Sequence, residues 1–129
     1  MQFGYTIVYV RDVNASIDFF ERAFGLERAF VSPDGEFGTL ATGGTALAFC
    51  QHATARESVG HDYLAAEDSA RPLGIEIGLV TADVPAACDR AVAAGATLLN
   101  PPKTKPWGQT VAYVRCPDGT LVELCTPMG

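Results

Sequence analysis

The sequence predicts an α+β fold in which tandem βαβββ repeats form a cupped, partly open mixed sheet around a central cleft. Two segments, which begin at Tyr5 and Glu76, share the same order of apolar and polar residues. Each runs from an apolar strand through an Asp-Val pair into a helical stretch that ends at a glycine. Each then closes with a Gly-Thr pair and a second apolar strand. Because a unit of this size cannot bury its sheet alone, we expect the two copies to share a cleft.

The repeats set the expected boundaries of one domain over residues 1–129. We place the first repeat at about 4–51, a linker at 52–73 and the second repeat at about 74–126. A chain of this length is typical of a single domain with a real core. The linker is polar, lacks clear periodicity and is longer than most loops, which predicts either a short helix within it or a flap beside the cleft.

The elements of the first repeat follow from residue type and spacing. Residues Tyr5–Val10 are β-branched or aromatic, as in a strand. Asp12 or Asn14 can cap the helix that follows, whose apolar residues recur at helical spacing until Gly25 ends it. A Ser-Pro-Asp-Gly turn and a Gly-Gly turn separate the three remaining strands, which we expect at 26–31, 36–41 and 45–50.

The second repeat has the same order. A strand is expected at 75–81, followed by a helix over Val84–Ala94 that Asp83 caps. Pro85 falls in the first helical turn, where a missing N–H costs nothing. The remaining expected strands are 97–99, Thr110–Arg115 and Leu121–Cys125.

Composition excludes several classes of partner. The net charge of −6 leaves no basic face for a phosphate backbone, so we expect no nucleic acid. The apolar start of the chain is too short for a signal segment or membrane span, so we expect a cytoplasmic protein without membrane contact. Four cysteines lack metal-site spacing and should be thiols, three of them in the core and Cys116 exposed in a turn.

Strand parity indicates which side chains face the cleft. A glutamate buried against a helix would be costly, so Glu123 should point away from the helix and into the cleft. The same alternation turns Glu76 inward on the strand at 75–81. Aligning the two repeats then makes Tyr5, Ile7 and Tyr9 the inward residues of the first strand.

Three motifs carry a resemblance to a known family. They are Val-Arg-Asp-Val-Asn-Ala-Ser-Ile-Asp-Phe-Phe at 10–20, Lys-Pro-Trp-Gly-Gln at 105–109, and Cys-Pro-Asp-Gly-Thr-Leu-Val-Glu-Leu at 116–124. In this order and spacing the chain resembles the vicinal oxygen chelate (VOC) superfamily over essentially its whole length. That superfamily includes glyoxalase I, extradiol dioxygenases, fosfomycin-modifying enzymes and bleomycin resistance proteins. The resemblance implies paired βαβββ repeats, usually in a dimer.

The resemblance also implies a place for a metal. In the enzymes of this superfamily a divalent metal is held by His and Glu at four inward strand positions, which here carry Tyr5, Ala48, Glu76 and Glu123. Only the two glutamates could be ligands, and a transition metal needs three or four N or O donors. We therefore predict no metal and no other cofactor. The two histidines lie outside these positions, at a strand end and in the linker: His52 and His61.

The first functional hypothesis is a metal-free binding protein of the glyoxalase/bleomycin resistance type, which sequesters a planar hydrophobic or aromatic compound. Its support is the missing ligands and the supply of aromatic residues near the cleft. The Lys-Pro-Trp-Gly run resembles one in metal-free relatives, which predicts Trp107 at the cavity mouth and the two glutamates on its floor. The predicted ligand-binding residues are Tyr5, Ile7, Tyr9, Phe37, Glu76, Trp107, Tyr113 and Glu123.

The second hypothesis is a lyase, isomerase or dioxygenase of the same superfamily, metal-dependent or carboxylate-based, that uses Glu76 and Glu123. Two carboxylates in one cavity repel each other, so one could keep a proton near neutral pH, and Glu123 is the candidate acid or base. Alternatively, Glu76 only bonds a neighbouring tyrosine or the backbone. An interaction domain without a small ligand has no support beyond the acidic surface. In every case exposed sheet edges favour a homodimer.

Overall fold

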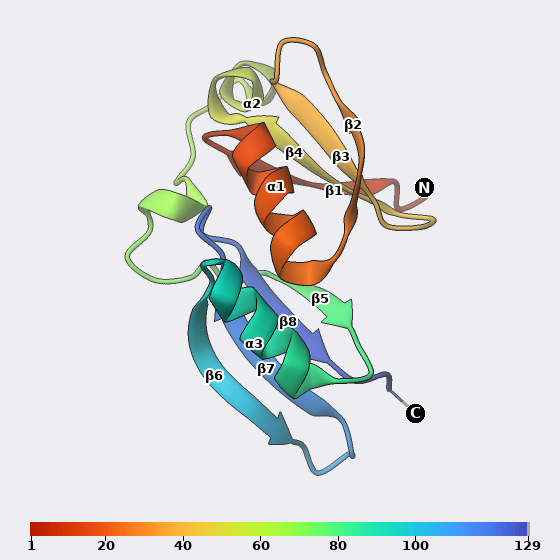
Figure 1. Cartoon of the computed structure of the whole chain (residues 1–129). Coiled ribbons are helices and arrows are strands. Elements are labelled where there is room, and N and C mark those ends of the chain that lie inside the picture. Colours follow the sequence, from red (N-terminus) through yellow and green to blue (C-terminus); the bar gives the residue numbers. More distant parts are fainter. Residues whose placement is uncertain (129) are drawn as a thin grey trace.

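The computed structural model describes residues 1–128 and has the α+β fold that the sequence predicts, with two open, four-stranded mixed sheets (Figure 1). The first repeat consists of β1 (Tyr5–Val10), α1 (Val13–Phe24), β2 (Glu27–Val31), β3 (Phe37–Ala41) and β4 (Ala46–Gln51). The second consists of β5 (Glu76–Val80), α3 (Val84–Ala94), β6 (Thr97–Thr104), β7 (Thr110–Arg115) and β8 (Leu121–Cys125). Between them lie α2 (His52–Val59) and the 3-10 helix η1 (Ala66–Asp68).

Both long helices begin and end where the sequence predicts. The side chain of Asp12 accepts a hydrogen bond from the Ala15 amide at 3.0 Å, and the side chain of Asp83 does the same for the Ala86 amide at 3.0 Å. These caps satisfy amides that have no partner within the helix. Gly25, with φ of 69°, ends α1 in the left-handed conformation that favours glycine.

The two sheets have the same strand order, β1-β4-β3-β2 and β5-β8-β7-β6. In each, the first strand of the repeat pairs in parallel with the last strand, and the other pairs are antiparallel. One consequence is that β1 and β5 are edge strands. Both helices lie on the near side of their sheets in Figure 1, so both uncovered faces turn to the far side of the molecule.

A single core joins the helix-facing sides of both sheets. It contains large side chains of the first repeat, such as Phe20 and Phe49, together with Val84, Val114 and Val122 of the second. Burying such a side chain contributes about 1.5–3 kcal/mol relative to leaving it exposed. The alternation predicted from strand parity is therefore present, because the residues between these positions lie on the uncovered faces.

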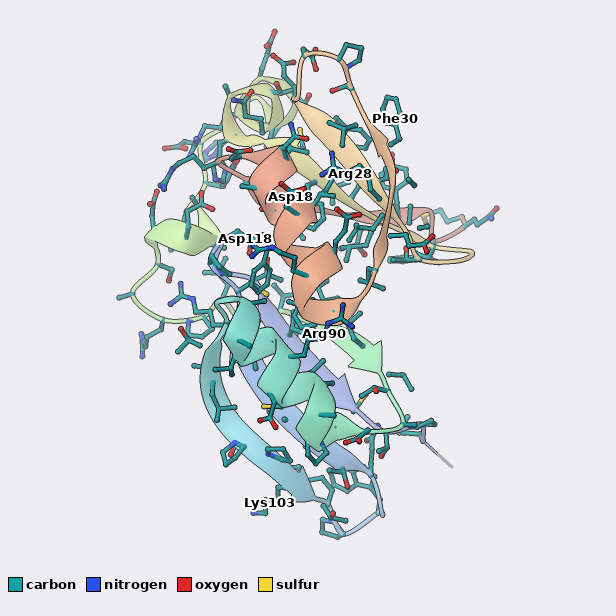
Figure 2. All side chains as sticks on the ribbon, viewed as in Figure 1. Asp18, Arg28, Phe30, Arg90, Lys103 and Asp118 are labelled. Carbon is teal, nitrogen blue, oxygen red and sulfur yellow. The ribbon has the colours of Figure 1, made fainter. Side chains whose placement is uncertain are left out.

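Two polar contacts tie the repeats together across this core. Arg90 of α3 donates from Nε to the Arg22 carbonyl at 2.8 Å and from Nη2 to the Glu21 carbonyl at 3.3 Å, so it satisfies the end of α1 (Figure 2). At the other end of α1, Ser16 Oγ donates to Asp118 Oδ2 at 2.8 Å. Asp118 lies in the turn between β7 and β8, so both ends of α1 contact the second repeat.

The strand predicted at 97–99 is wrong in length, since β6 continues to Thr104. The predicted strand ended at Leu99, before Pro101 and Pro102, which cannot donate to a neighbouring strand. Because β6 is an edge strand, the missing N–H groups can face away from β7. Two irregularities in the β6–β7 register, between Leu98 and Asn100 and between Asn100 and Lys103, accompany the prolines.

The linker contains the short helix that was one of its two predicted forms, because α2 occupies its first eight residues and Gly60 ends the helix with φ of 72°. A second correction concerns Cys116, which the sequence placed in an exposed turn. It is 3 % exposed, since its amide and carbonyl close the β7–β8 turn and its side chain joins the core. Within residues 1–128, no helix combines the length and the apolar character that crossing a membrane requires.

The 3-10 helix η1 packs directly on the second repeat. Arg115 Nη2 donates to the Ala66 carbonyl at 2.9 Å and to the Ser69 carbonyl at 2.8 Å. The backbone of Gly119 lies so close that a Cβ there would stand 2.3 Å from the carbonyl carbon of Ala66. A glycine is therefore required at this position by space as well as by its φ of 88°.

Substitution of Gly119 tests this close approach. Gly119→Ala should lower the free energy of unfolding by about 2–4 kcal/mol, because overpacking of about 1–3 kcal/mol adds to the strain of positive φ. Gly43→Ala is the matched control, since Gly43 occupies the equivalent turn of the first repeat with φ of 87° and nothing within 4 Å of its Cβ position. It should cost about 1 kcal/mol in urea denaturation. Equal losses in the two variants would contradict the packing of η1 against this turn.

Candidate functional site

The uncovered faces carry the side chains that strand parity assigned to them. In the β1–β4 pair, Ile7 lies opposite Ala48, and in the β5–β8 pair, Gly78 lies opposite Glu123. Tyr5 and Glu76 each occupy the first place of their parallel pair, whereas Ala48 and Glu123 each occupy the third. The alignment of the two repeats is therefore confirmed, because the registers place these four residues at corresponding positions.

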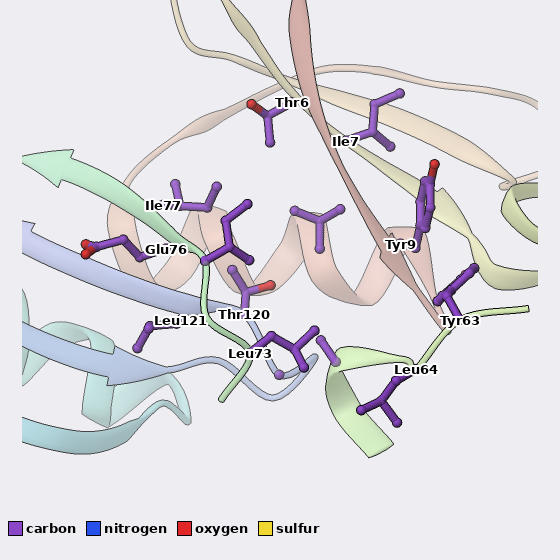
Figure 3. Close-up of a pocket in the computed structure, with 14 residues that line it drawn as sticks. Thr6, Ile7, Tyr9, Tyr63, Leu64, Leu73, Glu76, Ile77, Thr120 and Leu121 are labelled. Carbon is purple, nitrogen blue, oxygen red and sulfur yellow. The ribbon is translucent and has the colours of Figure 1, made fainter. Parts of the chain in front are cut away.

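A cavity of about 320 Å³ lies where the two edge strands β1 and β5 approach each other (Figure 3). One wall is β1 from Thr6 to Tyr9, and another runs along residues 75–77. The linker contributes Tyr63, Leu64 and Leu73, and the turn before β8 closes the far end. Most of the lining is apolar, and Glu76 is the one lining residue with a charged side chain. A concave, mainly apolar pocket with few polar groups is typical of small-molecule sites.

The structure brings three of the predicted ligand-binding residues into this cavity: Ile7, Tyr9 and Glu76. The remaining predicted residues lie on the uncovered faces or beyond them. Tyr5 is 65 % exposed at the start of β1, and Phe37 lies opposite Cys50, which places it on the uncovered face of the first sheet. Parity left the face of Phe37 open, and the β3–β4 register decides it.

Trp107 does not line this cavity, contrary to its predicted place at the mouth. It is 66 % exposed at the tip of the β6–β7 hairpin, where its Nε1 donates to Gln109 Oε1 at 3.0 Å. The extension of β6 explains the difference, because it moves the turn beyond the sheet and makes Lys103 part of the strand. A role for Trp107 in ligand binding stays a prediction.

Tyr113 and Glu123 form a hydrogen-bonded pair on the uncovered face of the second sheet. They lie opposite each other on β7 and β8, and the Tyr113 hydroxyl donates to Glu123 Oε2 at 2.8 Å. Donation to a carboxylate stabilises the protonated phenol, and with partial burial it raises the pKa of Tyr113 to about 12. The pair keeps the Glu123 carboxylate at a defined place on the sheet.

Glu76 is electrostatically linked to this pair. Its pKa is raised above the usual range, first because the sheet partly desolvates the carboxylate and then because the Glu123 charge repels a second negative charge. This is the arrangement that the sequence predicts for two carboxylates on one surface. Glu76 stands between the cavity and the Tyr113–Glu123 pair, so it can respond to a ligand in the cavity and to the charge beside it.

The donor set does not fit a divalent transition metal. Of the four inward positions, Tyr5 and Ala48 supply no carboxylate or imidazole, which leaves Glu76 and Glu123. In the part of the chain that the structure describes, no group of three or more His, Cys, Asp or Glu side chains is placed to hold a metal ion. Two carboxylates are fewer than the three or four donors such a site needs. The prediction of a metal-free protein stays a prediction.

The sequence predicted a flap beside the cleft as one form of the linker, but it assigned no linker residue to the site. Tyr63 lines the cavity and packs on Tyr9, with the ring centroids 5.1 Å apart. His52, which the sequence placed at a strand end, begins α2 and is buried. The available signal was the linker itself, because an ordered segment longer than most loops often serves a site beside it. Its polar composition gave no periodicity from which the inward residues could be assigned.

Comparisons with known proteins agree with this architecture. A family model described as "Glyoxalase/Bleomycin resistance protein/Dioxygenase superfamily" matches residues 2–124. A glyoxalase-related enzyme from Fulvimarina pelagi is 26 % identical, with a TM-score of 0.83 over 98 % of this chain and 88 % of that chain. A member of the Glyoxalase/bleomycin resistance protein/dioxygenase superfamily from Sphaerobacter thermophilus is also 26 % identical, with a TM-score of 0.70 over 98 % of each chain. No curated protein matches the sequence.

The charge coupling between the carboxylates can be measured directly. Glu123→Gln removes the negative charge beside Glu76 and Tyr113, so the pKa of Glu76 should fall toward 4.5 and that of Tyr113 should fall from about 12 toward 10. NMR titration of 13C-labelled carboxyl and tyrosine ring carbons would follow both groups. Glu27→Gln, which removes an exposed carboxylate from β2, should leave both values unchanged. An unchanged Tyr113 value in Glu123→Gln would contradict the hydrogen bond.

Proposed function

We propose that this chain, which belongs to the Glyoxalase/Bleomycin resistance protein/Dioxygenase superfamily, binds a small, planar and largely apolar molecule without a metal. The observation that carries the proposal is the cavity between β1 and β5 with its apolar walls and its one charged residue, Glu76. The ligand would be sequestered there rather than transformed.

The size and chemistry of the cavity support a compact aromatic ligand. Its volume of about 320 Å³ lies at the small end of the range for ligand pockets, about 300–1,000 Å³. The aromatic rings of Tyr9 and Tyr63 favour stacked or edge-on contact with a planar molecule, worth about 0.5–1.5 kcal/mol beyond area burial. The carboxylate of Glu76 would accept a hydrogen bond or pair with a positive charge, and it would disfavour an anion.

A homodimer forms part of this proposal. Tyr5, Ile75 and Val80 are each exposed by about two thirds, and the edges of β1 and β5 lack a neighbouring strand. Exposed apolar residues beside unpaired edges favour a partner, and a second copy with two-fold symmetry is the commonest one. Such a dimer would narrow the mouth of the cavity and shield the Glu76 and Glu123 carboxylates from water.

A second candidate is acid–base chemistry of the lyase or isomerase kind by Glu76 and Glu123. The raised pKa of Glu76 favours it, because a carboxyl group that holds its proton closer to neutral pH can give that proton to a bound ligand and take it back. Exchange of a bound carbonyl compound's hydrogen for solvent deuterium would distinguish this activity from binding alone. A metal-dependent form of this activity is not supported, because Glu76 and Glu123 are fewer donors than a metal site needs.

Binding can be tested with two aromatic dyes of opposite charge, an aminoacridine cation and an anilinonaphthalene sulfonate. We expect the cation to bind more tightly, and Glu76→Gln to weaken it about tenfold because a charge-assisted hydrogen bond is lost. Glu57→Gln, on the exposed side of α2, is the matched control and should bind as wild type. Ile7→Trp should abolish binding by filling the cavity, and a chelator should change nothing. Undiminished binding by Ile7→Trp would place the dye elsewhere.

The oligomeric state is expected to be a dimer in solution. Light scattering at micromolar concentration should return twice the chain mass of 13.6 kDa. Val80→Glu should shift the protein toward the monomer, because it introduces a charge where the uncovered face would meet its partner. A wild-type mass near that of one chain would refute the dimer while leaving the cavity itself intact.

A further inference from the structure

The linker contains a group of polar side chains that are buried although most of the segment is exposed. The side chains of His52, at the start of α2, and Glu67, in η1, are 11 % and 7 % exposed. Tyr63 lies between them in sequence and is partly buried. Removing such groups from water is costly unless they bond one another, so their burial requires a specific arrangement.

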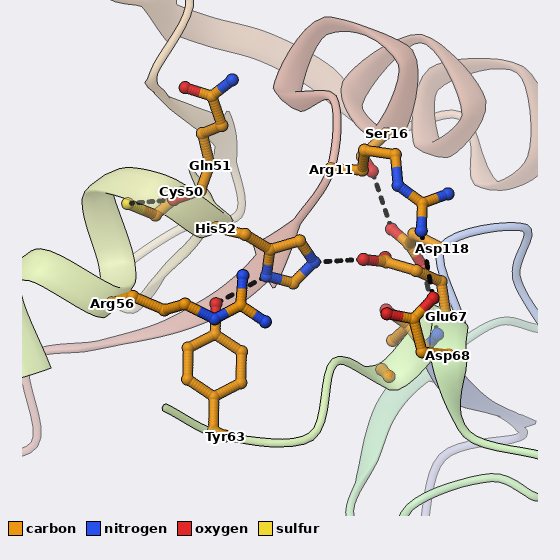
Figure 4. A network of polar contacts seen from close by, with 12 residues as sticks. Arg11, Ser16, Cys50, Gln51, His52, Arg56, Tyr63, Glu67, Asp68 and Asp118 are labelled. Atoms are coloured by element: carbon orange, nitrogen blue, oxygen red, sulfur yellow. Dashed lines mark hydrogen bonds and ion pairs between the residues drawn. The ribbon is translucent and has the colours of Figure 1, made fainter. Parts of the chain in front are cut away.

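These three side chains form one chain of hydrogen bonds (Figure 4). His52 Nδ1 lies 2.5 Å from the Tyr63 hydroxyl, and His52 Nε2 contacts Glu67 Oε1. An ionised carboxylate only accepts, so Nε2–H donates to Glu67, and in the neutral ring Nδ1 accepts from the Tyr63 hydroxyl. With both ring nitrogens engaged, the imidazole has one orientation, and that orientation determines where the Tyr63 hydroxyl can lie.

The ring of Tyr63 is held as firmly as its hydroxyl. Tyr9 packs against it with the centroids 5.1 Å apart and the planes inclined by 44°, and the guanidinium carbon of Arg56 lies 4.6 Å from its centroid. Both tyrosines line the cavity (Figure 3). The Tyr63 hydroxyl is directed to His52, so what Tyr63 offers the cavity is its ring rather than a free phenol.

The far end of the chain of hydrogen bonds is anchored on both repeats. Glu67 belongs to η1, which Arg115 holds on the second repeat, while Asp68 pairs with Arg11 at 3.0 Å on the first. The second oxygen of Glu67 is buried without a hydrogen-bond partner among the described residues, so the contact with His52 is the one its carboxylate has. Loss of the His52 side chain would therefore have two effects: the buried carboxylate of Glu67 would lose its partner, and the Tyr63 hydroxyl would no longer be held.

We propose that the linker builds the aromatic end of the ligand cavity: Tyr63, together with Tyr9, contacts the planar part of the ligand, and His52 and Glu67 are positioning residues that hold Tyr63 in place. This inference rests on the proposed function and extends it. The ligand's aromatic part lies against Tyr9 and Tyr63, and its donor or positive charge lies toward Glu76. The cavity thus favours planar cations through two contacts, one with the rings of Tyr9 and Tyr63 and one with the carboxylate of Glu76, which lie on the two sides of the β1–β5 junction.

The positioning role can be measured in the ligand-free protein. In wild type, NMR on tyrosine-labelled protein should show a nuclear Overhauser contact between the rings of Tyr9 and Tyr63, and His52→Ala should lose it. His61→Ala is the matched control, because His61 is an exposed histidine of the same linker that contacts only the Asp62 carbonyl among the described residues. His52→Gln can keep one of the two bonds and should recover the contact in part.

The recognition role is measured with the aminoacridine cation on the same set of variants. Tyr63→Ala should weaken binding about tenfold, because a stacking surface and its buried area are lost. His52→Ala should weaken it to a similar degree, His52→Gln less, and His61→Ala not at all. Tyr63→Phe keeps the ring and leaves His52 and Glu67 paired, so it folds without a stranded carboxylate and should weaken binding only about two- to threefold.

The outcomes separate this inference from the proposed function. If Ile7→Trp abolishes dye binding while Tyr63→Ala and His52→Ala bind as wild type, the cavity is a site but its aromatic end is wrongly assigned. If no dye binds to wild type, the proposed function fails. The contact between the rings of Tyr9 and Tyr63 in the ligand-free protein still tests the positioning role of His52. That role is supported if His52→Ala loses the contact and is overturned if the variant keeps it. Partial recovery in His52→Gln supports a role through the hydrogen bond rather than through general stability.

Discussion

α1 and α3 pack against each other, and this contact determines which surfaces of the chain remain uncovered. The apolar sides of both helices are buried in the common core, which contains Ile17 and Phe20 of α1 together with Val84 and Ala91 of α3. Arg90 satisfies the carbonyl end of α1, and Asp118 accepts from Ser16 near its start, so the helix is tied to the second repeat at both ends. Because the apolar sides of α1 and α3 are buried in the common core, neither helix can cover the second face of a sheet. The edge strands β1 and β5 then approach each other, and the cavity forms between them.

The two repeats share a backbone plan but differ in the chemistry of their uncovered faces. At corresponding positions the first repeat carries Tyr5 and Ala48 and the second carries Glu76 and Glu123. The first face therefore offers aromatic and apolar contact, and the second offers negative charge. The sheet partly desolvates the Glu76 carboxylate, and the negative charge of Glu123 further disfavours its ionisation, so the pKa of Glu76 lies above that of a free glutamate. A ligand at the junction meets both kinds of surface, so an asymmetric molecule with an apolar and a donor end fits best.

The linker connects the site to the stability of the whole chain. Its 3-10 helix packs on the turn that contains Gly119, and Arg115 bonds two of its carbonyls. The same short helix carries Glu67, whose carboxylate contacts His52 at the start of α2, directly after β4 of the first repeat. Burying the Glu67 carboxylate, the His52 imidazole or the Tyr63 phenol alone would be costly. Their burial is tolerated here because His52 forms a hydrogen bond with each of the other two. The segment that joins the repeats thus also holds their relative placement at the cavity.

The sequence by itself determined the repeat, the element order and the inward sides of β1, β4, β5 and β8. Those features depend on local signals: Asp12 and Asp83 as caps, Gly25 as a stop, and alternation that places Glu123 away from the helix. Only the tertiary structure decided the length of β6, since an edge strand tolerates Pro101 and Pro102 where a central strand would not. It also moved Trp107 away from the cavity and brought in Tyr63. The position of Trp107 follows from the extension of β6, whereas that of Tyr63 depends on how the linker folds back over β1. Such long-range packing leaves no periodic pattern in a polar segment.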